Sequence, residues 1–273
     1  MASETLNISS TTPAIPANGV GLHWQKSATK PDNSVDASAY VNLIDFANLA
    51  GGQIVDIPPA SPSSMDDEFN AANGTVYNSA KWTSNSLGAG STATQNYGWL
   101  DIHAAVNTGM NYIAQTPPNT RFSFVAKVAL TYAWANGIGT GTSAGMAIFN
   151  AGLFYYKFLV YAAVAADVNT YVVAVVVNNG SGADLILTSA QIGSVHPVWL
   201  RWDNSGPCGS GHFDFYWSAN GAAWMPLLTG EANNGHSLNS FATLRLCAFD
   251  GIAPAFGANG TALGSFDYFR RLV

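Results

Sequence analysis

Two aromatic runs in the second half of the chain carry the side chains best suited to chemistry. Residues 198–203 read VWLRWD, and residues 212–217 read HFDFYW. Because successive side chains of a strand point to opposite faces, each run has an apolar face and a polar-aromatic face. The apolar faces carry Val198, Leu200, Trp202, Phe213, Phe215 and Trp217. The polar-aromatic faces carry Asp203 and the five candidate ligand-binding residues, Trp199, Arg201, His212, Asp214 and Tyr216.

These five candidate residues suit the binding of sugars. Aromatic rings stack on the C–H faces of a sugar ring, while charged and amide groups form hydrogen bonds with its hydroxyls. An ordinary sheet ladder, in which Arg201 pairs with Asp214 across the strands and the aromatic rings pack, is the more common arrangement and stays open. The pattern therefore predicts a binding surface and assigns no catalytic residue.

The elements that position these residues read as strands throughout. Asn220-Gly221 predicts a two-residue hairpin turn with positive φ angles, flanked by Trp217 and Trp224. Asn- and Gly-rich turns separate further short apolar segments, a pattern typical of a β-sandwich. The expected strands upstream and downstream are 99–106, 121–130, 145–149, 153–160, 171–177, 184–187 and 241–249.

Short motifs along residues 66–273 resemble the concanavalin A-like lectin/glucanase jelly rolls. They are the WLRW run at 199–202, the YWS end of the next strand at 216–218, and the Asn-Gly turn before Trp224. Residues 66–69 (DDEF) resemble the opening of such domains, and residues 266–269 (FDYF) resemble their closing strand. The resemblance implies an all-β jelly-roll sandwich, and strand motifs of this kind specify fold better than function.

Carboxylates that could catalyse hydrolysis do not follow the pattern of that family. Its glucanases place two acids on one strand as E-x-D-x-x-E or E-x-D-x-E, whereas this chain has only three glutamates, Glu4, Glu68 and Glu231, and none begins the motif. The acids at 66–68 are interpreted as a solvated strand start. Asp101 and His103 share a strand face, which indicates a solvent-facing polar stripe, since no activated nucleophile accompanies them. The chain is therefore predicted not to be an enzyme.

Composition excludes several classes of protein. The chain has 273 residues, of which 48% are hydrophobic and 10% charged, with a net charge of −6. Its basic residues are scattered, so no nucleic-acid partner is expected. Cys208 and Cys247 are predicted to be free and buried thiols rather than a disulfide. No Cys/His cluster suggests zinc, so neither metal nor cofactor is expected.

Residues 1–65 are predicted to be an extended N-terminal arm with a small hairpin, ahead of a sandwich over residues 66–273. Ser, Thr, Pro and Ala dominate residues 1–19, and Gly, Pro and Ser mark a second linker at 51–64. The alternative interpretation is a disordered tail. The start of the chain lacks the basic and apolar regions of a signal peptide, and no segment is long enough to span a bilayer, so no membrane insertion is expected. The arm resembles short N-terminal pieces of bacteriophage virion proteins.

The segment Tyr171–Val177 is apolar on both faces, which predicts that both faces are covered. Together with the low charge, this predicts a homo-oligomer. The number three, a trimer, comes only from the resemblance to phage fibres and decoration proteins.

The resemblances together imply a non-enzymatic phage virion protein. The main expectation is a tail fibre or receptor-binding component, located in the virion and made in the host cytoplasm. Its arm would bind other virion proteins and its sandwich a host surface glycan. The alternatives are a capsid decoration protein, a free lectin-like module and a glycan-acting hydrolase.

Overall fold

A computed structural model describes residues 63–105, 109–134, 142–150, 154–165, 168–180, 184–193, 197–249 and 260–272. These residues form strands joined by turns, with one short 3₁₀ turn, η2 (Gly235–Ser237), and no α-helix among them. The compact unit that carries the strands spans Pro58–Ala219 and Trp224–Val273, and the segment Asn220–Ala223 is not part of it. The predicted arm and hairpin, residues 1–65, lie almost wholly outside the described residues, so the boundary at residue 65 stays a prediction.

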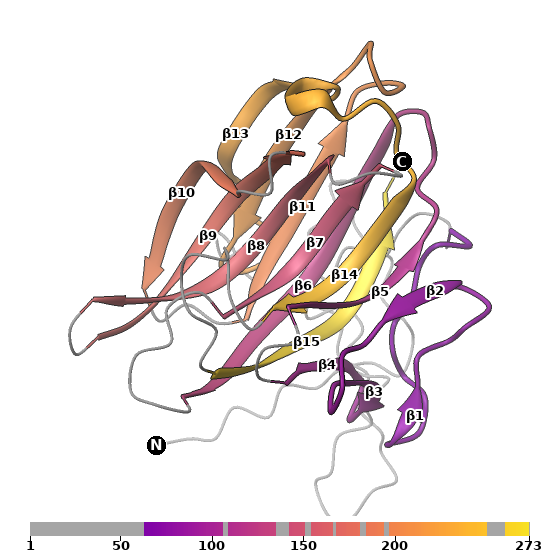
Figure 1. Ribbon diagram of the computed structural model, residues 1–273, viewed down its shortest axis with the longest axis vertical. Helices are drawn as coiled ribbons and strands as arrows, with labels where there is room; N and C mark the ends of the chain where they lie inside the picture. The colour runs from indigo at the N-terminus through magenta and orange to yellow at the C-terminus, as the bar shows by residue number, and fades with distance from the viewer. Residues whose placement is uncertain are drawn as a thin grey trace, which may run out of the picture. The chain divides into compact units, whose positions relative to one another are not determined.

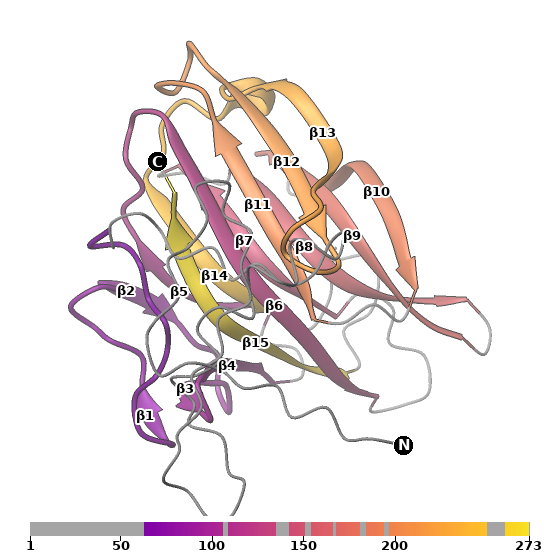
Figure 2. The same ribbon diagram turned by 180° about the vertical axis from the view of Figure 1, so that it is seen from behind.

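The strands form two sheets, in which all described pairs are antiparallel (Figures 1 and 2). The first sheet has eight strands in the order β1 (Thr75–Val76), β3 (Thr92–Asn96), β4 (Trp99–Ala104), β15 (Gly260–Arg271), β6 (Phe122–Trp134), β11 (Val198–Asn204), β12 (His212–Ser218) and β13 (Met225–Ala232). The second has seven strands in the order β10 (Leu185–Gly193), β9 (Val168–Asn179), β8 (Phe154–Ala165), β7 (Ser143–Phe149), β14 (Thr243–Phe249), β5 (Met110–Gln115) and β2 (Ser84–Ser86).

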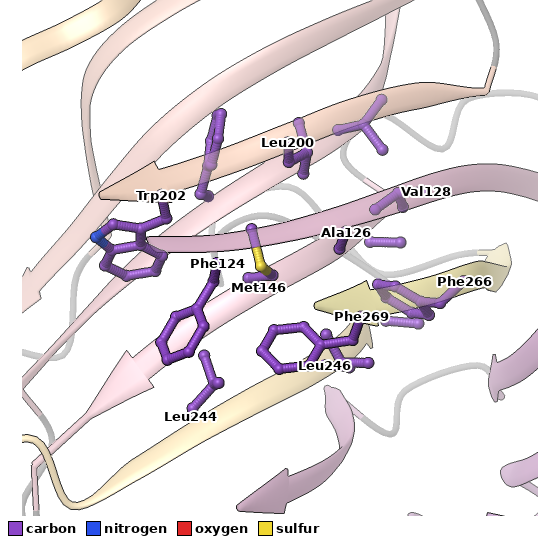
Figure 3. Close-up of a cluster of buried hydrophobic side chains, with 14 of the residues drawn as sticks. Phe124, Ala126, Val128, Met146, Leu200, Trp202, Leu244, Leu246, Phe266 and Phe269 are labelled. Carbon is purple, nitrogen blue, oxygen red and sulfur yellow. The ribbon is translucent and has the colours of Figure 1, made fainter. Parts of the chain in front are cut away.

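The main core lies between the two sheets (Figure 3). Phe124 on β6 and Trp202 on β11 reach it from the eight-stranded sheet, and Met146 on β7 reaches it from the seven-stranded sheet. Every apolar side chain predicted for the inner faces of β11 and β12 contacts this core, with Trp217 only partly buried. An all-β sandwich is thus confirmed, because period-2 alternation assigns each side chain to a face once the strand is known.

Strand β9 is covered on both faces, as its apolar sequence predicts. Val173 and Val175 belong to the main core, while Ala174 and Val176 belong to a second cluster on the outer face of the seven-stranded sheet. All four side chains are fully buried. The same outer face holds Lys157 of β8 in an ion pair of 2.6 Å with Asp184, which immediately precedes β10.

The predicted two-residue hairpin at Asn220-Gly221 is wrong. Strand β12 ends at Ser218 and β13 begins at Met225, so residues 219–224 connect them. Gly221 has φ of 75°, whereas Asn220 is not among the residues with positive φ. The Asn220 side chain instead accepts hydrogen bonds from the backbone N–H groups of Ala222 and Ala223, both at 3.0 Å. A side-chain-capped turn replaces the mirror-image turn that Asn-Gly usually favours.

Asp66 and Asp67 are buried anchors rather than part of a solvated strand start, whereas Glu68 is exposed. Asp66 and Asp67 are only 5% and 8% exposed. Asp67 accepts a hydrogen bond of 2.9 Å from the indole of Trp82, and its backbone pairs with Phe269 of β15. Glu68 binds Arg270 through two hydrogen bonds of 2.7 and 2.8 Å. These contacts join the opening motif, residues 66–69, to the closing strand of the sandwich. The acidic residues at 66–68 therefore stabilise the fold.

Within the described residues, no helix is long and apolar enough to cross a membrane. Both cysteines are free, which confirms that prediction, and Cys247 is buried whereas Cys208 is half-buried.

Candidate functional site

The five predicted ligand-binding side chains lie on the outer face of the eight-stranded sheet, on adjacent strands. Trp199 and Arg201 come from β11, and His212, Asp214 and Tyr216 come from β12. The two strands are paired directly, and Figure 2 shows them side by side between β6 and β13. Strand alternation explains why these residues share a face, because their neighbours in sequence fill the core.

The register of this pair differs from the expected ladder. Arg201 lies opposite Tyr216, and Asp203 lies opposite Asp214. Arg201 therefore does not pair with Asp214. Its guanidinium group donates two hydrogen bonds, of 2.9 and 2.7 Å, to the carboxylate of Asp203 in its own strand. Bidentate geometry of this kind fixes the orientation of both groups.

A pocket of about 260 Å³ opens on this face. It is lined by Arg121, Phe122, Ser123, Arg201, Asp203, Asn204, Ser205, His212 and Asp214. Three of the five predicted residues, Arg201, His212 and Asp214, line this pocket, and Tyr216 and Trp199 do not.

The two carboxylates of the pocket are held by different partners. Asp203 accepts a hydrogen bond of 2.5 Å from the hydroxyl of Ser123 on β6, in addition to those from Arg201. Asp214 accepts a hydrogen bond of 2.7 Å from the backbone N–H of Gly230. Its other oxygen lies 3.3 Å from Nε2 of His212. Like charges directly opposite each other in a sheet repel each other, and here Arg201 and His212 lie beside the two carboxylates.

Aromatic rings flank the pocket. The guanidinium carbon of Arg201 lies 5.5 Å from the ring centre of Tyr216 and 5.9 Å from that of Trp224, both of which are half-buried. Burial raises the pKa of the Tyr216 hydroxyl, and the neighbouring carboxylates of Asp214 and Asp203 add to that rise. The hydroxyl therefore stays a hydrogen-bond donor at neutral pH.

Trp199 takes another role than predicted. It is only 7% exposed, and its indole N–H donates a hydrogen bond of 2.9 Å to the hydroxyl of Tyr268 on β15. It packs with Val125 and Tyr268 in a small apolar cluster on the outer face. Such a buried ring supports the surface and is not itself available for stacking.

Sequence reasoning did not select six of the nine residues that line the pocket, and three of these, Asp203, Ser123 and Arg121, carry polar side chains that bear on its chemistry. Asp203 shares the face of Arg201 by alternation, so it could have been chosen beside Asp214. Ser123 and Arg121 belong to β6 and the residue before it, and only the pairing of β6 with β11 brings them to this place. No group of three or more His, Cys, Asp or Glu side chains that could hold a metal occurs among the described residues.

No protein-family model matches the chain, and no curated protein is similar enough to be matched. Solved structures do match. A xylan β-1,4-xylosidase from Bacillus halodurans C-125 is 15% identical with a TM-score of 0.50, over 80% of this chain and 41% of that one. A GH43 protein from Bacillus licheniformis is 16% identical with a TM-score of 0.48, over 79% and 40%. A β-1,3-glucanase from Mycobacterium marinum is 13% identical with a TM-score of 0.46, over 80% and 100%.

The comparison corrects the expected function. The main expectation was a non-enzymatic virion protein, whereas the similar structure with a TM-score of 0.50 is a xylosidase. The prediction that the chain is not an enzyme is contradicted in the same way. The chain spans about two fifths of the length of the two Bacillus structures it matches. At these identities the likeness shows the fold, which is a concanavalin A-like jelly-roll β-sandwich.

Proposed function

We propose that the sandwich is a glycan-acting hydrolase domain whose active site is the pocket at Asp203 and Asp214. The observation that carries the proposal is the placement of these two carboxylates directly opposite each other across β11 and β12, inside one pocket. The opposition itself does not stabilise the fold, because each charge raises the free energy of the other, whatever the hydrogen bonds of each carboxylate contribute. Arrangements that lower the stability of a fold, such as two opposed carboxylates, are found mainly at functional sites.

The separation of the two carboxyl groups distinguishes the two routes of glycoside hydrolysis. Side chains directly opposite in an antiparallel pair have Cβ atoms about 4.5–5.5 Å apart. Retaining glycosidases hold their two carboxyl groups about 5–5.5 Å apart, whereas inverting enzymes need about 6.5–9.5 Å to admit a water molecule. Asp203 is hydrogen-bonded to Ser123 on β6 and Asp214 to Gly230 on β13, which lie on the outer sides of the pair, so the carboxyl groups are drawn further apart than their Cβ atoms.

The hydrogen bonds around each carboxylate assign its role. Asp203 is fixed on both oxygens by Arg201 and Ser123, which suits a nucleophile that attacks from one defined direction. Asp214 accepts a hydrogen bond from the backbone N–H of Gly230 and keeps its other oxygen 3.3 Å from Nε2 of His212. As the partner of the nucleophile, it takes the part of the general acid that protonates the leaving oxygen and then of the base that activates water.

The substrate we propose is a β-linked polysaccharide. The half-buried rings of Tyr216 and Trp224 flank Arg201 next to the pocket and offer a stacking surface for an adjacent sugar. The names of the similar structures, a xylosidase and a β-1,3-glucanase, make xylan and β-1,3-glucan the first substrates to test. As separate proposals, residues 1–65 attach the domain to a partner protein, and the chain self-associates.

The test measures the release of reducing ends by the full chain from xylan and from β-1,3-glucan. We expect activity on at least one polymer and a loss of about 10³-fold or more in Asp203→Asn and in Asp214→Asn, since both carboxylates act in the same step. Asp101→Asn is the matched control, because Asp101 lies on β4 of the same sheet and outside the pocket lining. Absence of activity, or equal activity of the parent and both pocket variants, would refute the proposal.

A further inference from the structure

A second polar-aromatic cluster lies on the same face of the eight-stranded sheet, away from the pocket. The ammonium group of Lys127 on β6 lies 5.2 Å from the ring centre of Trp99 on β4 and 5.2 Å from that of Trp199 on β11. It also forms an ion pair of 2.5 Å with Asp267 of β15. Four neighbouring strands thus contribute one side chain each to this cluster.

The distance between cluster and pocket follows from the strand geometry. Trp199, Arg201 and Asp203 alternate along β11, so Trp199 lies four residues, or about 13 Å, from Asp203. Strand β4 is the third strand from β11, which adds about 14 Å across the sheet. A ligand that touches both Trp99 and Asp203 must therefore be longer than one or two sugar units.

The side chains of the cluster differ in how much they offer to a ligand. Trp199 is buried beneath its neighbours and donates its N–H to Tyr268. Trp99 is half-buried, and among the described residues no acceptor takes a hydrogen bond from its indole N–H. Lys127 and Asp267 keep 22% and 30% of their side-chain surfaces exposed. A half-buried aromatic ring and a partly exposed ion pair of zero net charge therefore lie side by side.

We propose that Trp99, Lys127 and Asp267 form a distal subsite that binds a neutral sugar unit of a polysaccharide chain whose other end occupies the pocket. The indole of Trp99 stacks on the sugar ring, while Lys127 donates to, and Asp267 accepts from, its hydroxyls. Because the ion pair is neutral overall, it suits hydroxyls better than a charged sugar. The catalytic meaning of this subsite rests on the proposed function of the pocket, whereas its capacity to bind sugar does not.

The subsite predicts a dependence on chain length. In Trp99→Ala we expect KM for the xylan or β-1,3-glucan polymer to rise about tenfold with kcat nearly unchanged, because a distal ring contributes binding and no chemistry. Cleavage of the shortest oligosaccharides that fit the pocket alone should not change. Trp99→Phe should restore most of the lost affinity, since it keeps an aromatic face. The control is Tyr97→Asn, which removes an 87% exposed ring two residues away at a position with φ of 54°.

Binding is measured separately by the retardation of each variant in native gels that contain the same polymers. Weaker retardation of Trp99→Ala, with Tyr97→Asn equal to the parent, supports the subsite even if no cleavage is detected, in which case only the proposed hydrolysis fails. If the parent cleaves the polymer and Trp99→Ala matches it on long and short substrates, the subsite is refuted and the hydrolase proposal stands. If the parent neither binds nor cleaves either polymer, both proposals are refuted.

Discussion

The hydroxyl of Tyr156 on β8 donates a hydrogen bond of 2.7 Å to Oε1 of Glu231 on β13, and this contact joins the two sheets of the sandwich. The two groups meet beneath Gly235, where a Cβ atom would lie only 2.5 Å from the tyrosine oxygen and 2.7 Å from the carboxylate. His236, which follows with φ of 52°, places Nε2 at 3.7 Å from the same carboxylate oxygen. The 3₁₀ turn therefore closes over a polar contact between the layers.

Tyr156→Phe should lower the free energy of unfolding by about 1–2 kcal/mol, because it leaves a partly buried carboxylate oxygen without its donor. Burial raises the pKa of Tyr156, and Glu231 adds to the rise, so the hydroxyl remains a donor throughout the neutral range. Urea denaturation at neutral pH measures the change. Tyr97→Phe serves as the control, since that ring is 87% exposed, and an equal small effect in both variants would contradict the role of the contact.

The carboxylate pair of the pocket predicts opposite effects of two similar substitutions on stability. Asp214→Asn removes the repulsion from Asp203 and can still accept from the N–H of Gly230, so the free energy of unfolding should rise by about 0.5 kcal/mol. Asp203→Asn loses the bidentate bond with Arg201, so it should fall by about 1 kcal/mol. Thermal unfolding at neutral pH measures the change in stability for each of the two variants. If both substitutions destabilise the protein, the repulsion between Asp203 and Asp214 is already cancelled by their neighbours, and the prediction is wrong.

Lys157→Met should be among the most destabilising single changes, at about 3–5 kcal/mol. The side chains of Lys157 and Asp184 are each 3% exposed, and removing the cation leaves a buried carboxylate whose remaining described partners are the neutral side chains of Tyr155 and Asn178. Burial lowers the pKa of Lys157, and Asp184 opposes that shift. Lys127→Met is the matched comparison, because its ion pair with Asp267 is more exposed and should contribute less than about 1 kcal/mol. Chemical denaturation of both variants provides the measurement.

The thiol of Cys247 should make the protein less stable in alkali. Burial raises its pKa to about 12, from a usual value near 9 in the unfolded chain. Above pH 9 the unfolded chain releases this proton while the folded chain keeps it, so the free energy of unfolding falls by up to about 1.4 kcal/mol per pH unit. Denaturation between pH 9 and 10 should show a shallower slope in Cys247→Ala than in the parent. An identical slope would refute the assignment to this thiol.

The sequence predicted correctly which side chains of a strand face the core, but it did not predict how neighbouring strands are aligned. Alternation placed Phe213 and Phe215 in the core because the side-chain period of a strand does not depend on its partners. The cross-strand register did not follow, because residues 205–211 form a long connection that no turn type fixes, and Arg201 met Tyr216 instead of Asp214.

The pocket shows the same limit. Ser123 lies 80 residues before Asp203 along the chain, and their hydrogen bond exists only because β6 pairs with β11. A search for two acids spaced on one strand could not find a carboxylate pair that is formed across two strands. The acids at 66–68 were misassigned for a related reason, since their partner strand, β15, ends the chain.

Trp199 and Trp217 provide the last prediction and reverse the order expected from sequence. Alternation alone predicts that Trp217, on the core face, is the more important ring. In the structure Trp199 is 7% exposed, with its N–H bonded to Tyr268, whereas Trp217 is only partly buried at the end of β12. Trp199→Ala should therefore cost about 3–5 kcal/mol, and Trp217→Ala clearly less, because the cost follows the packed volume that is lost.

The measurement is urea denaturation of the full chain, with Trp199→Phe as a control that keeps a ring but loses the hydrogen bond. That control should fall between the parent and Trp199→Ala, since one hydrogen bond contributes about 1 kcal/mol. A larger loss in Trp217→Ala than in Trp199→Ala would show that the aromatic cluster on the outer face adds little to stability.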